Sequence, residues 1–397
     1  MNMSVGLIEK AVAAVAARLL PKSFKGRLDL TLPSGRVVTL GGATPGEQAD
    51  LTLRNFKVLW AGFRRAQLGF FERYLAGDIV SQNPTAFFRF YLQNRSGLDG
   101  ASAMFNSSLV DKLWHKMRDN SRSGAADNIA AHYDLGNSFY KLWLDDTMSY
   151  SSAVFDGKVN SLEAAQGLKY QMVMEAAEVK EGFKVLEIGC GWGGFAEMAA
   201  KAGATLRGIT LSKEQLAFAQ ERLKREKLDG KAELVIEDYR DTQGVFDAIA
   251  SVEMIEAVGE PHWPAYFKTL FDRLKPGGAA AIQGITILED NYAAYRSGVD
   301  FIQRYVFPGG MLLTKEIMRE QAQKAGLLLE KIECFGLSYA ETLRQWRVRF
   351  DAAWPKIEPL GFDERFKKLW TLYLCYCEAG FAEGIIDVGI YKIRKPV

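Results

Sequence analysis

The chain has 397 residues, of which 48% are hydrophobic and 25% charged, and its net charge is +2. This length predicts two domains, and the near-neutral charge argues against nucleic acid as the main partner. Four cysteines and three histidines are too few and too scattered for a disulfide framework or a metal site. No secretory signal is evident, and the apolar stretch 7–20 holds three charged residues. We therefore expect a cytoplasmic protein.

The first 125 residues are expected to form a small α+β domain that contacts lipid or a membrane surface. Alanine-rich Leu7–Leu20 predicts a helix ended by Pro21; it either packs on its own domain or lies on an anionic membrane. Strand-like Arg27–Leu32 and Arg36–Leu40 flank the turn Pro33-Ser34-Gly35 and predict a hairpin. The other expected elements are strands at Leu51–Leu53 and Val58–Trp60 and helices over Leu68–Leu75 and Pro84–Asn94.

Residues 126–397 are expected to form a second domain after a polar linker over 119–127. Apolar strands alternate there with helical patterns, which predicts a parallel sheet covered by helices on both faces. The last two strands are expected at an antiparallel edge, giving a doubly wound α/β domain of about seven strands. The expected strands are Val185–Ile188, Thr205–Thr210, Ala232–Ile236, Ala248–Val252, Ala279–Ile287, Leu327–Phe335 and Ile385–Arg394, with helices over Glu214–Glu226 and Ala265–Leu274.

The segment Val185–Gly194 carries the clearest chemical signal. An apolar run ends in glycines before a helical pattern, which is typical of a strand, a tight turn and a helix that together bind nucleotide-like ligands. The dinucleotide fingerprint needs another glycine spacing and an acid about 20 residues later, whereas Glu187 precedes these glycines. An acid ahead of the turn suits a ligand with an ammonium group and no phosphates, such as S-adenosylmethionine.

Several motifs resemble the cyclopropane-fatty-acid synthase family of S-adenosylmethionine-dependent methyltransferases, from about Asn128 to the C-terminus. They are His132–Asn137, Met148–Ala153, Val185–Gly194, Gly208–Gln215, Glu237–Asp241, Ser251–Glu256, Phe301–Pro308 and Leu374–Cys377. The first domain resembles the family's N-terminal domain more loosely. The resemblance implies a class I, Rossmann-like methyltransferase fold with a doubly wound seven-stranded sheet.

The resemblance also implies how the methyl donor is held. Glu187 would pair with the donor's ammonium group, and backbone amides of the turn would bind its carboxylate. Thr210, Ser212 and Gln215 would hydrogen-bond the ribose, and Tyr239 would lie beside the adenine. The full set of expected donor-binding residues is Tyr133, Tyr150, Ser151, Glu187, Gly189, Cys190, Gly191, Gly193, Thr210, Ser212, Gln215, Tyr239 and Arg240.

The chemistry implied by the family is methyl transfer to the double bond of an unsaturated acyl chain in a membrane phospholipid. The resulting carbocation needs aromatic faces, carboxylates, a dry site and a base; family members are thought to use bound bicarbonate. The residues that would hold bicarbonate here are Glu256 and Tyr339, with Ser152 and Gln283 where the family has cysteine and histidine, while Cys377 would line the pocket.

Gln283 can donate a hydrogen bond but cannot shuttle a proton. The sequence therefore identifies the reaction product less firmly than it identifies the methyl donor. We expect a cyclopropane fatty acid, with a methyl-branched unsaturated chain as the alternative. Methylation of nitrogen or oxygen in a small molecule, or lipid binding without catalysis, are competing functions. Peripheral contact at the inner face of the membrane and a homodimer complete the expectations.

Overall fold

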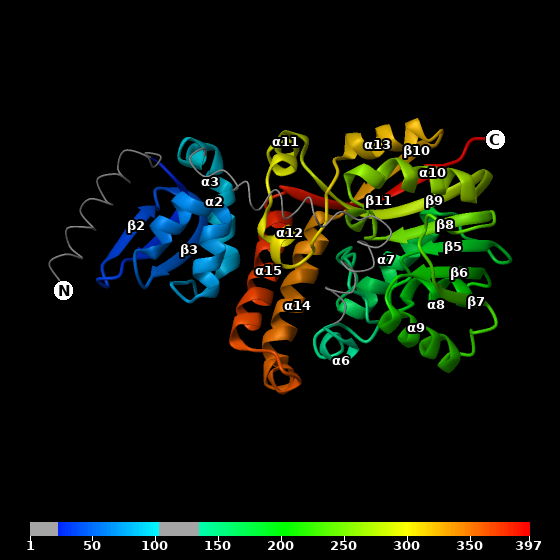
Figure 1. Cartoon of the computed structure of the whole chain (residues 1–397), viewed down its shortest axis with the longest axis horizontal. Helices are drawn as coiled ribbons and strands as arrows, with labels where there is room; N and C mark the ends of the chain where they lie inside the picture. The colour runs from blue at the N-terminus through cyan, green and yellow to red at the C-terminus, as the bar shows by residue number, and fades with distance from the viewer. Residues whose placement is uncertain (1–22, 103–134) are drawn as a thin grey trace.

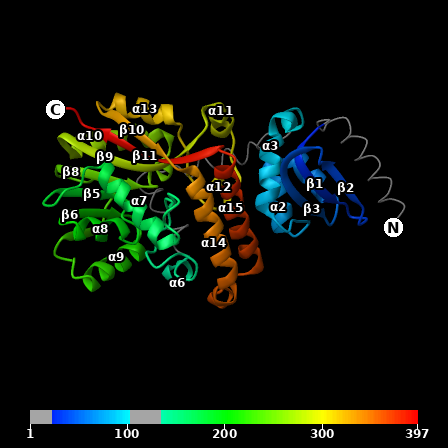
Figure 2. The same ribbon diagram turned by 180° about the vertical axis from the view of Figure 1, so that it is seen from behind.

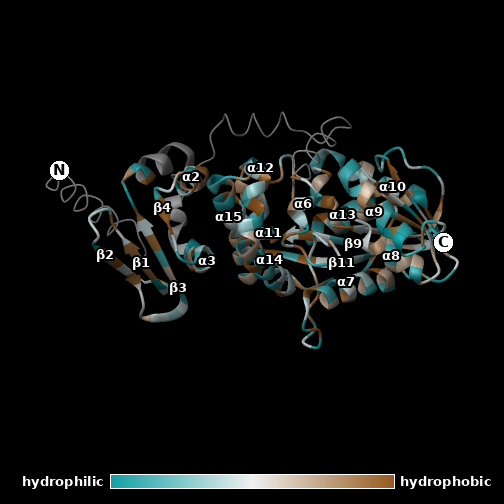
Figure 3. Cartoon of the chain, turned by 90° about the horizontal axis from the view of Figure 1, so that it is seen from below, coloured by the Kyte–Doolittle hydropathy of each residue, from teal (hydrophilic) through white to brown (hydrophobic). Residues whose placement is uncertain are grey.

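The computed structural model describes residues 23–102 and 135–397. The described residues form an N-terminal part and a larger part that lie side by side along the long axis of the molecule (Figure 1). A view from below shows the same arrangement (Figure 3). The predicted helix over Leu7–Leu20, the predicted linker at 119–127 and the predicted ligand residue Tyr133 lie outside the described residues. The boundary between residues 125 and 126 therefore stays a prediction.

The N-terminal part is a four-stranded sheet packed against two helices. Its strands, in the order β2-β1-β3-β4, are β1 (Lys25–Thr31), β2 (Val37–Gly41), β3 (Thr44–Leu53) and β4 (Ile79–Val80). The antiparallel pairing of β1 with β2 confirms the predicted hairpin. The helices are α2 (Lys57–Leu75) and α3 (Pro84–Ser102).

One element of this part was wrongly predicted as a strand. Val58–Trp60 lies in the first turn of α2, not in a strand. The Asn55 side chain accepts a hydrogen bond from the Lys57 amide at 2.9 Å. It thereby satisfies a backbone donor near the start of the helix, and such local bonds favour helix initiation over strand pairing.

The larger part contains the predicted seven-stranded sheet, in the order β10-β11-β9-β8-β5-β6-β7. Its strands are β5 (Lys184–Ile188), β6 (Thr205–Thr210), β7 (Ala232–Ile236), β8 (Phe246–Val252), β9 (Leu274–Ile287), β10 (Leu328–Cys334) and β11 (Ile386–Arg394). The five strands from β5 to β9 pair in parallel, whereas β11 runs antiparallel to both β9 and β10. The antiparallel edge is therefore confirmed.

Both faces of this sheet are covered by helices, which makes the domain doubly wound. On β5, Leu186 packs into one core with α10 and α13, while its neighbour Val185 packs into another core with α7, α8 and α9. Successive strand residues point to opposite faces, so the two cores lie on opposite sides of the sheet. In the reverse view of the molecule, α7 lies across the strands of the sheet (Figure 2). These helices are α7 (Leu162–Ala176), α8 (Gly194–Lys201), α9 (Lys213–Arg225), α10 (Trp263–Arg273) and α13 (Lys315–Lys324).

The remaining helices lie around the C-terminal ends of the strands and between the two parts. They are α6 (Asn137–Tyr140), α11 (Glu289–Ser297), α12 (Phe301–Tyr305), α14 (Gly336–Ile357) and α15 (Glu364–Ala382), with short 3-10 turns at Ile255–Ala257, Glu260–His262 and Glu358–Leu360. In Figure 1, α14 and α15 form a hairpin between the sheet and the N-terminal part. No described helix combines the length and the apolar character needed to cross a bilayer.

The N-terminal part contacts α12 and α15 through both apolar and charged residues. The ring of Phe71 stacks on the ring of Phe301 with a centroid distance of 4.3 Å, and both side chains are almost fully buried. Arg89 donates to Glu383 at 2.7 Å on the same interface. The two parts therefore share an apolar cluster at this interface.

Candidate active site

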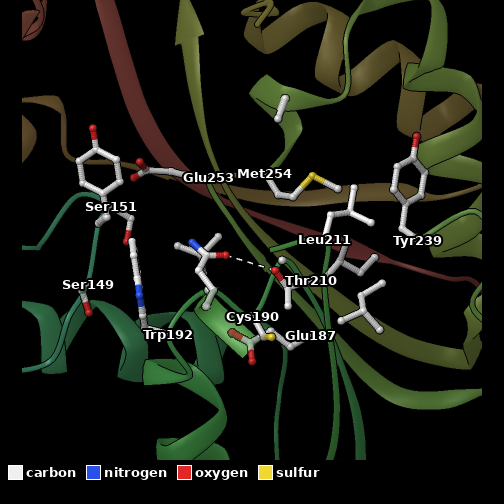
Figure 4. Close-up of a pocket in the computed structure, with 18 of the residues that line it drawn as sticks. Ser149, Ser151, Glu187, Cys190, Trp192, Thr210, Leu211, Tyr239, Glu253 and Met254 are labelled. Atoms are coloured by element: carbon white, nitrogen blue, oxygen red, sulfur yellow. Dashed lines mark hydrogen bonds between the residues drawn. The ribbon is translucent and has the colours of Figure 1, made fainter. Parts of the chain in front are cut away.

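A first cavity of about 140 Å³ lies at the C-terminal ends of β5, β6 and β8. This is the edge of a doubly wound sheet where ligands bind. Figure 4 shows Glu187 and Cys190 together on one side of it, Glu253 and Met254 on the opposite side, and Tyr239 at the far end. The predicted donor residues that line it are Tyr150, Ser151, Glu187, Gly189, Cys190, Gly191, Thr210, Gln215 and Tyr239.

The glycine turn after β5 requires glycine for two reasons. Gly189 and Gly191 have φ angles of +82° and +49°, which side chains disfavour. A Cβ on Gly189 would also approach the Met254 side chain to 2.9 Å. The amides of Gly189 and Cys190 both donate to the Ile209 carbonyl, at 3.0 and 2.9 Å. These two amides therefore hold the turn to β6.

Glu187 is buried at the end of β5 and is ready for a cationic partner. Its Oε2 atom has no hydrogen-bond partner among the described residues. Burial raises the pKa of this carboxyl to about 8, although Lys169 and Arg222 oppose the shift. An ammonium group placed beside Glu187 would restore its ionised form, so the residue fits the amino group of S-adenosylmethionine.

Three of the expected donor residues have structural tasks and do not line the first cavity. Ser212 caps α9, because its hydroxyl accepts the Gln215 amide at 3.2 Å, and its side chain does not line the cavity. Arg240 donates to Asp238 at 2.7 and 2.6 Å and also does not line the cavity. Gly193 precedes α8 as its N-cap, with φ +82°. Thr210 remains in the wall and donates to Gln215 Oε1 at 3.2 Å.

A second cavity, of about 260 Å³, has mostly apolar walls built by α12, α14, α15 and the strand β9. Leu92 of the N-terminal part also lines it. Cys377 lies in its wall, and burial raises the pKa of this thiol, which therefore stays protonated. Tyr150, Glu253 and Ala257 line both cavities. The two cavities therefore meet at these three residues.

The carboxylate of Glu253 lies at this junction and collects three hydrogen bonds. Its Oε1 atom accepts from the Ser152 amide at 2.7 Å and from Gln283 Nε2 at 2.8 Å. Its Oε2 atom accepts from the Tyr339 hydroxyl at 2.6 Å. The predicted residues Ser152, Gln283 and Tyr339 are thus brought together, but around Glu253 rather than around Glu256.

Sheet register explains this convergence. Val252, the last residue of β8, pairs with Gln283 of β9, and the Glu253 amide donates to the Gln283 carbonyl at 2.8 Å. Glu253 has a φ of +49°, which is rare for a residue with a side chain. Backbone strain of this kind concentrates at functional sites.

Glu256 has a different environment from the one predicted. Its Oε1 atom accepts a hydrogen bond from the Ile285 amide, and its Oε2 atom has no partner among the described residues. The side chain lines the second cavity only. Burial, with the nearby charge of Glu253, raises the pKa of Glu256 to about 8. At neutral pH, Glu256 is therefore a neutral acid.

Glu253 is the ionised member of this pair. Burial raises its pKa, but hydrogen bonds from Tyr339, Ser152 and Gln283 and the charge of Lys169 oppose that shift. Two N–H groups donate to Oε1 and the Tyr339 hydroxyl donates to Oε2, and hydrogen bonds donated to a carboxylate favour its ionised form. We therefore assign the negative charge to Glu253.

Sequence reasoning missed both Glu253 and the buried Lys169. The Lys169 ammonium donates to Ser151 Oγ at 2.6 Å and lies 3.8 Å from the centre of the Tyr170 ring. Burial lowers the pKa of Lys169 to about 8, against the raising effect of Glu253, Asp145 and Glu187. Two glutamates three residues apart at a strand end were a visible signal, whereas nothing local marked Lys169.

A family model described as mycolic acid cyclopropane synthetase matches residues 120–391. The tuberculostearic acid methyltransferase UfaA1 of Mycobacterium tuberculosis is 37% identical over 391 residues, which cover 96% of this chain and 91% of that protein. The cyclopropane-fatty-acyl-phospholipid synthase of Escherichia coli is 33% identical over 370 residues, or 90% of this chain and 89% of that protein.

Solved structures agree with these matches. The cyclopropane synthase MmaA2 from Mycobacterium tuberculosis superimposes with a TM-score of 0.64 at 28% identity, covering 68% of this chain and 98% of that one. The mycolic acid cyclopropane synthase CmaA1, solved with SAH and CTAB, gives a TM-score of 0.64 at 26% identity over the same shares.

Proposed function

Because the chain belongs to the mycolic acid cyclopropane synthetase family and is an S-adenosylmethionine-dependent C-methyltransferase, we propose that its acceptor is the double bond of an unsaturated phospholipid acyl chain. One observation carries this proposal: the donor cavity adjoins a larger apolar cavity, and the two share the lining residues Tyr150, Glu253 and Ala257. A small polar acceptor would not need such a space, whereas an acyl chain would fill it.

The donor binds in the first cavity, with its ammonium group at Glu187 and its methionine part beside Tyr150 and Ser151. The alkene lies in the second cavity and attacks the sulfonium methyl, so that a C–C bond forms while the S–CH₃ bond breaks. The carbocation is stabilised by the charge of Glu253 and by the ring faces of Tyr150 and Tyr339. Apolar walls exclude the water that would quench it.

Loss of a proton then determines the product. Removal from the new methyl closes a cyclopropane, and removal from a chain carbon leaves a methyl-branched alkene. We propose the methyl-branched chain as the first candidate, because the relative UfaA1, which matches 96% of this chain, is named a methyltransferase. The cyclopropane expected from the sequence is the second candidate, supported by the likeness to the Escherichia coli synthase.

Bicarbonate stays a prediction, and the geometry does not favour it. The donors that were expected to hold it, from Ser152, Gln283 and Tyr339, already bind Glu253. We also propose cytoplasmic action with peripheral contact at the inner face of the membrane, since phospholipid acyl chains have to be reached in a bilayer. The homodimer stays a prediction.

The test is to incubate the full-length protein with methyl-labelled S-adenosylmethionine and vesicles of unsaturated phosphatidylglycerol, then to analyse the released fatty acids by mass spectrometry and NMR. A gain of one labelled CH₂ unit per chain is expected, and the proton spectrum separates cyclopropane from branched alkene. Vesicles of fully saturated phospholipid are the control. Equal labelling of saturated and unsaturated vesicles, or none of either, would contradict the proposal.

A further inference from the structure

The junction of the two cavities is occupied by a carboxylate of the chain itself, that of Glu253. The Glu253 carboxylate accepts from the Ser152 amide, the Gln283 side chain and the Tyr339 hydroxyl, at distances between 2.6 and 2.8 Å. These three donors come from three different segments: the loop before α7, the strand β9 and the helix α14. Three donors from separate segments thus form an anion-binding site, and the anion that they bind is the side chain of Glu253.

We propose that Glu253 is the general base of the reaction, accepting the proton that the carbocation loses, and that no free bicarbonate takes part. This inference rests on the proposed function and concerns the same site. A carboxylate offers about four acceptor positions, of which three are used. The remaining position is available to a substrate proton.

The proton balance of this step closes without a further reagent. The C–H bond of the cation breaks, and its electron pair becomes the new C–C bond of a ring or the new C=C bond of a branched alkene. The proton goes to Glu253 and then to solvent when the product leaves. S-Adenosylhomocysteine leaves as a neutral thioether, so the positive charge of the donor departs as this proton.

Glu253 keeps a side chain at a backbone conformation that disfavours one. With φ at +49°, position 253 would suit glycine better than glutamate. The neutral acid Glu256, next to the same cavity, makes no bond to any of the three donors that hold Glu253. The two glutamates are therefore not interchangeable, and only Glu253 lies where donor and acyl chain meet.

The first arm of the test uses the wild-type protein. Turnover on unsaturated phosphatidylglycerol vesicles is measured in CO₂-free buffer and again with 20 mM added bicarbonate, a concentration of about the order that would saturate a weak anion site. Equal rates are expected. A rate that drops on removal of bicarbonate and returns on its addition would overturn the inference while leaving the proposed methyl transfer intact.

The second arm uses variants. Glu253→Gln should lose at least about 100-fold in turnover, the effect of losing a positioned base, while its calorimetric affinity for S-adenosylmethionine stays within a few-fold. Glu253→Gly relieves the backbone and leaves room for a small anion, so bicarbonate or formate should restore part of its activity. Glu178→Gln is the matched control, because Glu178 also has a positive φ, of 55°, but lines neither cavity. Glu253→Gln activity near wild type would refute the role.

A binding measurement keeps the inference testable even if the lipid substrate is another one. Saturable binding of ¹³C-bicarbonate, followed by NMR, is expected for Glu253→Gly and not for the wild type. Saturable binding of ¹³C-bicarbonate to the wild type would overturn the inference. Absence of lipid turnover in the wild type would instead count against the proposed function alone.

Discussion

The hydroxyl of Tyr339 on α14 donates a 2.6 Å hydrogen bond to Oε2 of Glu253, 86 positions earlier at the end of β8. The bond joins the helical hairpin to the sheet at the point where the two cavities meet. The Tyr339 hydroxyl is the only hydroxyl among the three groups that donate to Glu253. Removing this hydroxyl therefore changes the charge distribution of the junction without altering the backbone there.

Tyr339→Phe should lower kcat about 10- to 100-fold, because a hydrogen bond to a charged group contributes about 1.5–3 kcal/mol. The KM for S-adenosylmethionine should change little, since Tyr339 lines only the acyl cavity. Steady-state kinetics on vesicles measure both. Tyr391→Phe is the control, because it removes a buried hydroxyl bonded to Thr286 outside both cavities; equal effects of the two changes would contradict a role at the junction.

Donor binding should release a proton near neutral pH. Burial raises the pKa of Glu187 to about 8, so the free protein holds a proton there at pH 7, and an ammonium partner favours its loss. Calorimetry of S-adenosylmethionine binding in buffers of different ionisation enthalpy measures the protons released. Release should vanish in Glu187→Gln, and an unchanged value in that variant would exclude Glu187 as the source.

Glu256 should make the protein less stable as pH rises. Its pKa is about 8 in the folded state against 4.5 for the free side chain. Between these values only the folded state holds the proton, so the free energy of unfolding falls with pH, by up to about 1.4 kcal/mol per pH unit. Denaturant unfolding of wild type and Glu256→Gln between pH 5 and 9 should show the wild type losing stability relative to the variant. Parallel curves would refute the prediction.

Lys169→Met should shift the acid limb of the pH–rate profile to higher pH. The Lys169 charge lowers the pKa of Glu253, so its removal makes that carboxylate harder to ionise. A merely structural role for Lys169 would lower the rate at every pH without moving the limb. Lys268→Met is the control, because Lys268 pairs with Asp272 on the surface of α10.

Phe71→Ala should uncouple lipid turnover from donor binding. Phe71 stacks on Phe301 across the contact between the two parts of the molecule, and loss of a buried phenylalanine costs about 3–5 kcal/mol. Thermal unfolding should show a lower Tm, and turnover on vesicles should fall, while the affinity for S-adenosylmethionine persists because its cavity lies elsewhere. Full turnover in a destabilised Phe71→Ala would show that the contact is not needed for catalysis.

The strands β5 to β9 could be predicted because buried parallel strands are nearly continuous apolar runs. Val58–Trp60 was wrong because a short apolar run fits helix and strand equally, and the Asn55 side chain decided between them. The glycine turn and Glu187 were found from local spacing alone.

The centre of the site could not be found in that way. Glu253, Ser152, Gln283 and Tyr339 meet only through sheet register and the position of α14, which no local pattern encodes. Likewise, the resemblance could not distinguish residues that line the donor cavity from Ser212, which caps a helix, and Arg240, which pairs with Asp238.

The position of β11 inside the sheet, between β9 and β10, has a consequence for synthesis on the ribosome. Strands β5 to β9 and the donor cavity at their ends are complete once residue 287 has emerged. Strand β10 can join the sheet only after β11 is made, some fifty residues later, and the helical hairpin that walls the acyl cavity lies between them in the chain. During translation the part of the enzyme that forms the donor cavity therefore folds first, and the part that forms the acyl cavity is completed last.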